Sequence, residues 1–93
     1  MQNEAGVSAG VGAPSDPVRV TVLVRPECRT CDRMVLVVEA ICAEAGEEYT
    51  TVSVDDDPEL RGEYGDRIPV VLVDGEELAS WRVEPDELRR ALA

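Results

Sequence analysis

The pattern of hydrophobic and polar positions predicts four strands after a leading segment without periodicity. The valine-rich run at 18–24 (VRVTVLV) is typical of a buried strand. Polar and apolar residues alternate near the end of 49–54 (YTTVSV), which favours a half-exposed edge strand. The run at 70–73 is continuously apolar and therefore internal. Asp74-Gly75 then predicts a hairpin turn into a more polar strand at 77–80.

Three helices are expected between and after these strands. The first, 29–45, is closed by Gly46. The second is short, with Asp57 as N-cap and Pro58 at its first position, and reaches about Tyr64. The third is 85–92. The core-facing positions of the first helix are expected to be Met34, Val38, Ile41 and Ala45.

The order of these segments is β-α-β-α-β-β-α. A right-handed crossover makes the first two strands parallel, and the hairpin makes the last two antiparallel. With the two apolar strands inside, the spatial order is 2-1-3-4. The prediction is an α/β domain at 18–93, a four-stranded mixed sheet flanked by three helices, preceded by a disordered Gly-, Ala-, Ser- and Pro-rich tail at 1–17.

Composition narrows the chemistry available to this domain. The formal net charge is −11, and all nine cationic side chains are arginine, which argues against nucleic acid as a partner. Histidine is absent, which excludes Cys-His and Ser-His-Asp nucleophile systems. No apolar run approaches the roughly 20 residues that cross a bilayer. Because the cysteines number three and no secretory signal is recognisable, we expect a cytoplasmic protein.

The candidate chemistry lies at the junction of the first strand and the first helix, in Cys28-Arg29-Thr30-Cys31. A cysteine at a helix N-terminus faces unpaired N–H groups that favour thiolate, and Arg25 and Arg29 add to this effect. Cys28 is therefore the expected nucleophile. Cys31, one turn further, is the expected resolving thiol.

The cysteines also allow interpretations other than a redox pair. The pair could be half of a zinc site, but without histidine, and with Cys42 eleven residues beyond Cys31 on the same helix, no metal site is expected in one chain. Cys42 itself is interpreted as a small buried hydrophobe rather than a redox group.

Ile68-Pro69 precedes the internal third strand, whose start should lie beside the end of the first strand and Cys28. A cis proline there would present backbone atoms of Ile68 to an incoming extended chain. The alternative is a proline that simply begins a strand. Its position beside the cysteine pair favours the functional interpretation.

Together these motifs resemble the glutaredoxin-like branch of the thioredoxin fold over residues 18–93. The resemblance rests on RPECRTC after a valine-rich strand, on RIPVVLVDG beginning 36 residues after Cys31, and on a closing PDELRRAL. It implies thiol–disulfide exchange with Cys28 attacking, Cys31 resolving and Pro69 as the cis proline. It also implies that Arg25 occupies the basic position before the motif that assists glutathione binding in relatives.

The chain departs from dithiol glutaredoxins in ways that bear on the electron donor. Arg29-Thr30 replaces Pro-Tyr between the cysteines, and Ala79-Ser80 followed by Trp81 replaces Gly-Gly after the last strand. These departures weaken the case for glutathione. Trp81-Arg82 with Pro85-Asp86 is faintly similar to glutaredoxin-like redoxins that a flavoprotein of the thioredoxin reductase type reduces. No bound cofactor is expected, and the donor is an external thiol or such a reductase.

Acidic residues near the motif support the same view. Glu27, Asp32 and the run Asp55-Asp56-Asp57 are expected at the edge of the sheet that carries Cys28, where they oppose anionic glutathione. The alternative for the aspartates is a helix cap in a solvated turn. Trp81 is expected at this edge too, either docking a partner or anchoring the last helix in the core.

The leading hypothesis is a monomeric oxidoreductase that reduces disulfides of proteins or small thiols. Besides the two catalytic cysteines, the candidate substrate-contacting residues are Arg25, Arg29, Thr30, Ile68, Pro69 and Trp81. One alternative is a dimer that shares a [2Fe–2S] cluster through its Cys28 thiolates. Another is an interaction domain without enzymatic activity.

Overall fold

The computed structural model describes residues 18–93, so the tail predicted at 1–17 lies outside the described residues. The strands are β2 (Val20–Val24), β3 (Tyr49–Ser53), β4 (Val70–Val73) and β5 (Glu76–Ser80). The helices are α1 (Arg29–Ala45), α2 (Pro58–Tyr64) and α3 (Pro85–Leu92), with a 3₁₀ turn, η2 (Val54–Asp56), before α2. Within 18–93, no helix has the length and apolar character needed to cross a membrane.

The strands form one mixed sheet in the order β3-β2-β4-β5, which confirms the predicted order and the α/β class. β2 pairs with β3 in parallel, from Val20 opposite Tyr49 to Val24 opposite Ser53. β2 also pairs with β4 antiparallel, and β4 with β5. The β4–β5 turn has positive φ at both Asp74 (54°) and Gly75 (84°), as a type I′ hairpin turn requires.

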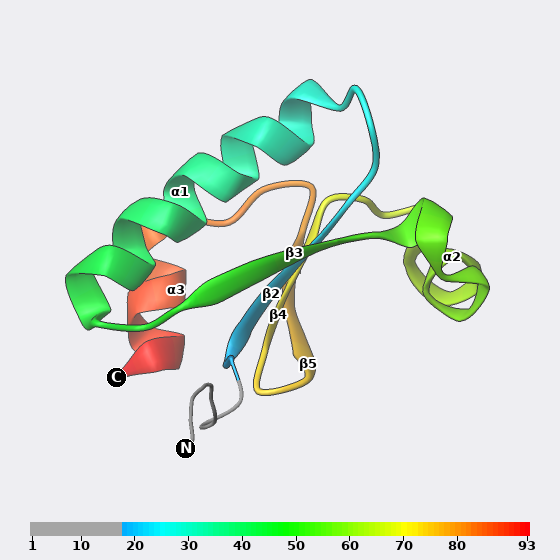
Figure 1. Cartoon of the computed structure of the whole chain (residues 1–93). Coiled ribbons are helices and arrows are strands. Elements are labelled where there is room, and N and C mark those ends of the chain that lie inside the picture. Colours follow the sequence, from blue (N-terminus) through cyan, green and yellow to red (C-terminus); the bar gives the residue numbers. More distant parts are fainter. Residues whose placement is uncertain (1–17) are drawn as a thin grey trace, which may run out of the picture.

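The two faces of the sheet are buried by different helices. In Figure 1, α1 and α3 lie together on one side of the sheet, and α2 lies apart from them near the end of β3. Alternate residues of β2 enter different clusters, since Val20 and Val22 pack with α1 and α3 while Leu23 packs with residues around α2. This is the two-residue period of a strand buried on both faces.

Local sequence signals explain where the helices begin and end. Cys28 is the N-cap of α1, and Gly46 ends that helix with a left-handed φ of 72°. The Asp57 side chain accepts hydrogen bonds from the backbone N–H groups of Glu59 and Leu60 and so caps α2, as predicted.

Three predicted boundaries and one predicted core position differ in the structure. β2 begins at Val20 rather than at 18, because the ladders on both sides start there. β3 ends at Ser53, opposite the last residue of β2, and Val54 instead begins η2. β5 begins at Glu76, one residue early, because the turn is only two residues long. Ala45 is exposed rather than core-facing, since it lies on the last turn of α1.

Candidate active site

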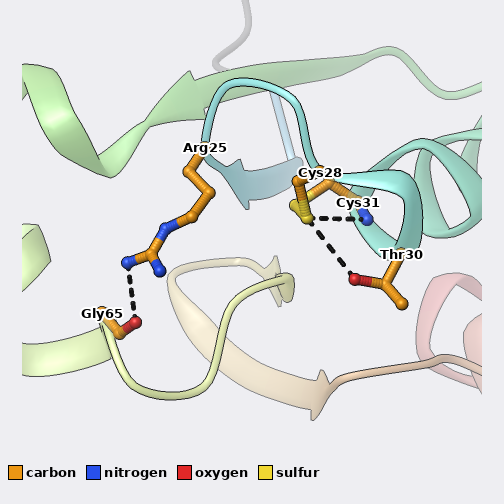
Figure 2. Close-up of a disulfide and its surroundings, with 5 residues drawn as sticks. All are labelled: Arg25, Cys28, Thr30, Cys31 and Gly65. Carbon is orange, nitrogen blue, oxygen red and sulfur yellow. Dashed lines mark hydrogen bonds between the residues drawn. A yellow bond between two sulfur atoms is a disulfide. The ribbon is translucent and has the colours of Figure 1, made fainter.

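The site is a disulfide between Cys28 and Cys31 at the N-terminus of α1, with Cα atoms 5.2 Å apart (Figure 2). The chain leaves β2 at Val24 and crosses Arg25-Pro26-Glu27 before it enters the helix. Proline interrupts the strand, and Glu27 has φ 55°, a left-handed conformation that is uncommon for a residue with a side chain. The turn therefore places both cysteines on the rim of the sheet.

The Cys28 sulfur sits at the end of the helix, where backbone donors lack partners. The Cys31 N–H donates to Cys28 Sγ at 3.1 Å, and Thr30 Oγ1 lies 3.4 Å from the same sulfur. Figure 2 shows both contacts. Sulfur thus takes the place that a serine or aspartate oxygen usually fills at an N-cap.

The two sulfurs differ in exposure. Cys28 is half-buried, whereas Cys31 is 2% exposed and packs in the cluster with Ile68, Val54 and Leu23. An incoming disulfide can reach the first cysteine and cannot easily reach the second. Only the first of the two cysteines is thus accessible to a reactant from solution.

Arg25 lies on the site's rim but points away from the sulfurs. Its guanidinium donates to the backbone carbonyl of Gly65 at 2.8 Å, which ties the loop before Cys28 to the end of α2 (Figure 2). Sequence reasoning missed Gly65 as a partner, because a carbonyl acceptor 40 residues away leaves no trace in side-chain identity. The contact of Arg25 in this structure therefore holds the loop before Cys28 in place.

The Ile68-Pro69 peptide bond is cis, as the resemblance to glutaredoxin-like proteins implies. Both residues are buried, and Ile68 shares a cluster with Cys31, against which Cys28 also packs. The Pro69 carbonyl accepts the N–H of Trp81 at 2.8 Å, which joins the start of β4 to the residue after β5. The cysteine pair, Ile68-Pro69 and Trp81 are thus brought to one end of the sheet.

Trp81 is exposed, so the alternative that it anchors the last helix in the core is wrong. The residue is 61% exposed and has φ 72°. Val83, two residues on, is 5% exposed and packs with Leu88 of α3, so it provides the anchor instead. The remaining candidates, Arg29 and Thr30, are exposed on the first turn of α1.

The neighbouring acidic residues divide into two groups. Asp57 is the N-cap of α2, which confirms the helix-cap interpretation for this aspartate. Asp55 and Asp56 are exposed in η2, and Glu27 and Asp32 are exposed beside the disulfide. None of these carboxylates is hydrogen-bonded to either sulfur.

Cys42 lies outside the site. It is the free cysteine of the described residues, 1% exposed on the buried face of α1. Burial raises the pKa of its thiol, and the nearby Glu47 adds to the shift. At neutral pH the group is therefore a neutral thiol, which agrees with its interpretation as a small core residue.

Known proteins resemble this chain over most of its length. Residues 19–93 match the model of the family described as "Glutaredoxin-like domain (DUF836)". An uncharacterized protein of Mycobacterium tuberculosis is 38% identical over 80 residues, which cover 81% of this chain and 82% of that protein. An uncharacterized protein of Mycobacterium bovis matches to the same extent.

Solved structures show the same architecture. The X-ray structure of target protein XcR50 from X. campestris is 32% identical with a TM-score of 0.62, covering 78% of this chain and 93% of that one. The solution structure of Ne2328 from Nitrosomonas europaea has a TM-score of 0.71 at 22% identity, covering 89% and 100%. A thioredoxin mutant from Halobacterium salinarum has a TM-score of 0.55 at 23% identity, covering 78% and 69%. The fold is thus thioredoxin-like.

Proposed function

This chain belongs to the glutaredoxin-like domain family (DUF836), and we propose that it is a thiol–disulfide oxidoreductase that works through Cys28 and Cys31. The observation that carries the proposal is the disulfide itself. Cys28, which is half-buried, caps a helix through its sulfur and is bonded to the buried Cys31.

The reaction begins with both cysteines reduced. The N–H of Cys31 and the positive end of the α1 dipole stabilise negative charge on Cys28 Sγ, which favours the thiolate. This thiolate attacks one sulfur of the substrate disulfide. A Cys28–substrate disulfide forms, the substrate S–S bond breaks, and the first thiolate leaves and takes a proton from water.

The Cys31 thiolate then attacks Cys28 Sγ. The Cα atoms of the two cysteines are 5.2 Å apart in the disulfide, so the sulfurs come within bonding distance. The intramolecular disulfide forms, the mixed disulfide breaks, and the second substrate thiolate leaves. The protein has lost two electrons and the substrate has gained two. An external thiol, or a flavoprotein of the thioredoxin reductase type, returns the protein to the dithiol by the reverse exchange.

The surrounding residues support this proposal by position. Buried Ile68 and Pro69 hold the backbone beside Cys31, and Arg25 fixes the loop before Cys28 through Gly65. An extended substrate chain meets this rim from the side on which Arg29, Thr30 and Trp81 are exposed. The remaining part of the fold supplies the rigid frame.

The test is turnover of 2-hydroxyethyl disulfide by the reduced protein, with dithiothreitol as electron source. We expect Cys28→Ser to fall to the rate of protein-free solution, because the remaining cysteines cannot begin the exchange. Cys42→Ala is the matched control and keeps the activity, since it removes the buried thiol alone. A fully active Cys28→Ser variant, or loss of activity in Cys42→Ala only, would contradict the proposal.

A further inference from the structure

A groove runs along α1 away from the disulfide. It has a volume of about 430 Å³ and lies between one stripe of α1 and the loop that joins β5 to α3. Its largely apolar walls are formed by Thr30, Met34, Val37, Trp81, Val83 and Pro85. We call this the α1 groove. Residues 30, 34 and 37 recur at helical spacing, so the helix presents a continuous wall.

The α1 groove opens beside the attacking sulfur. Thr30 is part of its wall and also lies 3.4 Å from Cys28 Sγ through its hydroxyl oxygen. From Thr30 to Val37 the helix rises about 10 Å, at 1.5 Å per residue. That length accommodates roughly three residues of an extended chain at about 3.3 Å each. A segment flanking a substrate cysteine therefore fits along the groove while the substrate sulfur is at Cys28.

Trp81 is held in place at the mouth of the groove. Its backbone N–H donates a hydrogen bond to the Pro69 carbonyl, and its φ of 72° is unusual for a bulky residue. A strained conformation that leaves Trp81 61% exposed brings no folding advantage, which points to a function outside the core. Exposed aromatic side chains of this kind are common anchors in protein interfaces.

The charge of the groove has the opposite sign to that of the whole chain. Arg33 and Arg82 line it together with Glu84. Arg82 is hydrogen-bonded to Glu84, so that pair is matched. Among the contacts of residues 18–93, Arg33 makes no ion pair. One positive charge is thus left over in the groove of a protein whose net charge is −11.

We propose that the α1 groove binds an extended segment of a disulfide-bonded protein substrate, with an apolar side chain between α1 and Trp81 and a carboxylate paired with Arg33. The inference rests on the proposed function and specifies its substrate class. Glutathione offers carboxylates but no apolar side chain, so it leaves the walls formed by Met34, Val37 and Val83 without a contact. A peptide segment satisfies both the apolar walls and the unmatched charge.

The test uses symmetric pentapeptides whose central cysteine is bonded to 2-mercaptoethanol, so that chain direction does not matter. Glu-Leu-Cys-Leu-Glu is compared with Lys-Leu-Cys-Leu-Lys, with Glu-Gly-Cys-Gly-Glu and with glutathione disulfide. Rates of reduction by the reduced protein are measured at 0.15 M ionic strength. Each is divided by the rate with 2-hydroxyethyl disulfide, so that changes in thiol reactivity cancel.

We expect the acidic leucine peptide to react about threefold faster than the basic one, as an exposed ion pair allows. We also expect it to exceed the glycine peptide by roughly tenfold, from burial of leucine. The net charge of −11 alone predicts the reverse charge preference. Arg33→Glu should invert that preference, whereas Arg90→Glu, the same charge change on α3, should not. Trp81→Gly, which suits the positive φ, should remove the leucine preference.

The two kinds of substrate distinguish failure of the proposed function from failure of the groove assignment. If neither the peptides nor 2-hydroxyethyl disulfide are reduced, the proposed function fails. The groove assignment alone is overturned if that disulfide is reduced but the basic peptide reacts as fast as the acidic one, if Arg33→Glu and Arg90→Glu behave alike, or if glutathione disulfide outpaces every peptide.

Discussion

In the proposed mechanism, Cys28 combines two roles, as the cap of a helix and as a nucleophile. As the N-cap of α1 it must offer an acceptor to the N–H of Cys31, and as a reactive thiol it must remain reachable. A thiolate satisfies both, because the charge that makes it a nucleophile also makes it a good hydrogen-bond acceptor. Cys42 lies 14 residues after Cys28, on the buried face of α1, and shows what the same side chain does without these contacts.

The contrast between Cys28 and Cys42 can be measured directly. In the reduced native protein at pH 8, we expect iodoacetamide to alkylate Cys28 rapidly and Cys42 only after unfolding. The reason is that burial both blocks Cys42 and raises its pKa, which leaves little thiolate. Peptide mass mapping with and without urea checks this. Equal labelling of Cys42 under both conditions would mean that α1 does not bury it.

At the scale of elements, α2 matters because its end supports the loop before Cys28. Gly65 ends this helix in a right-handed conformation, and its carbonyl holds Arg25. An added Cβ at Gly65 would lie 2.5 Å from the carbonyl oxygen of Arg61. At Gly62, inside the same helix, a Cβ would meet nothing within 4 Å.

The two glycines therefore make a matched pair. Gly65→Ala should lower the free energy of unfolding by about 1–3 kcal/mol, as overpacking does. Gly62→Ala should raise it by roughly 0.5–1 kcal/mol, because alanine favours a helix interior. Urea unfolding of both variants tests this. If Gly65→Ala proves as stable as Gly62→Ala, the close approach at the end of α2 is wrong.

The ion pair between Glu44 of α1 and Arg89 of α3 makes the free energy of unfolding depend on pH. Hydrogen bonding to Arg89 holds the pKa of Glu44 below its ordinary value of about 4.5. A carboxyl whose pKa is lower in the folded state stabilises it above the ordinary pKa. That contribution is lost as pH falls through the folded value.

We therefore expect Arg89→Gln to be destabilised relative to the natural sequence at pH 7, with the difference shrinking as the pH falls below the folded pKa of Glu44. In the same variant, the pKa of Glu44 should return upward toward its ordinary value. Urea unfolding at several pH values and NMR titration of the carboxyl measure the two effects. A stability difference that grows on acidification would contradict this ion pair.

At the scale of the whole molecule, the sheet order and the place of the disulfide follow from local sequence. Valine runs mark the internal strands, and Asp57-Pro58 and Asp74-Gly75 mark a helix start and a turn. These signals act over a few residues, so sequence alone predicts them. Strand ends such as Ser53 depend instead on how far the partner strand extends, and therefore needed the structure.

The tertiary contacts of the site could not be predicted from the sequence, because they too depend on distant parts of the chain. The bond from Arg25 to Gly65 and the bond from Trp81 to Pro69 join residues that are far apart along the chain. Arg33 was also missed, although Thr30, Met34 and Val37 form a stripe at helical spacing that could have indicated a lined groove beside the motif. The exposure of Trp81 excluded the core-anchor role, which its sequence position left equal to partner docking.

The most direct test of the account is the mass of a trapped intermediate. Reduced protein carrying Cys31→Ser and Cys42→Ala is mixed with excess 2-hydroxyethyl disulfide, and the adduct is located by peptide mapping. We predict one 2-mercaptoethanol group per chain, bonded to Cys28, that persists without Cys31 and is expelled when Cys31 is present. A chain that stays unmodified at Cys28, or an adduct that persists equally with Cys31 intact, would contradict the exchange mechanism.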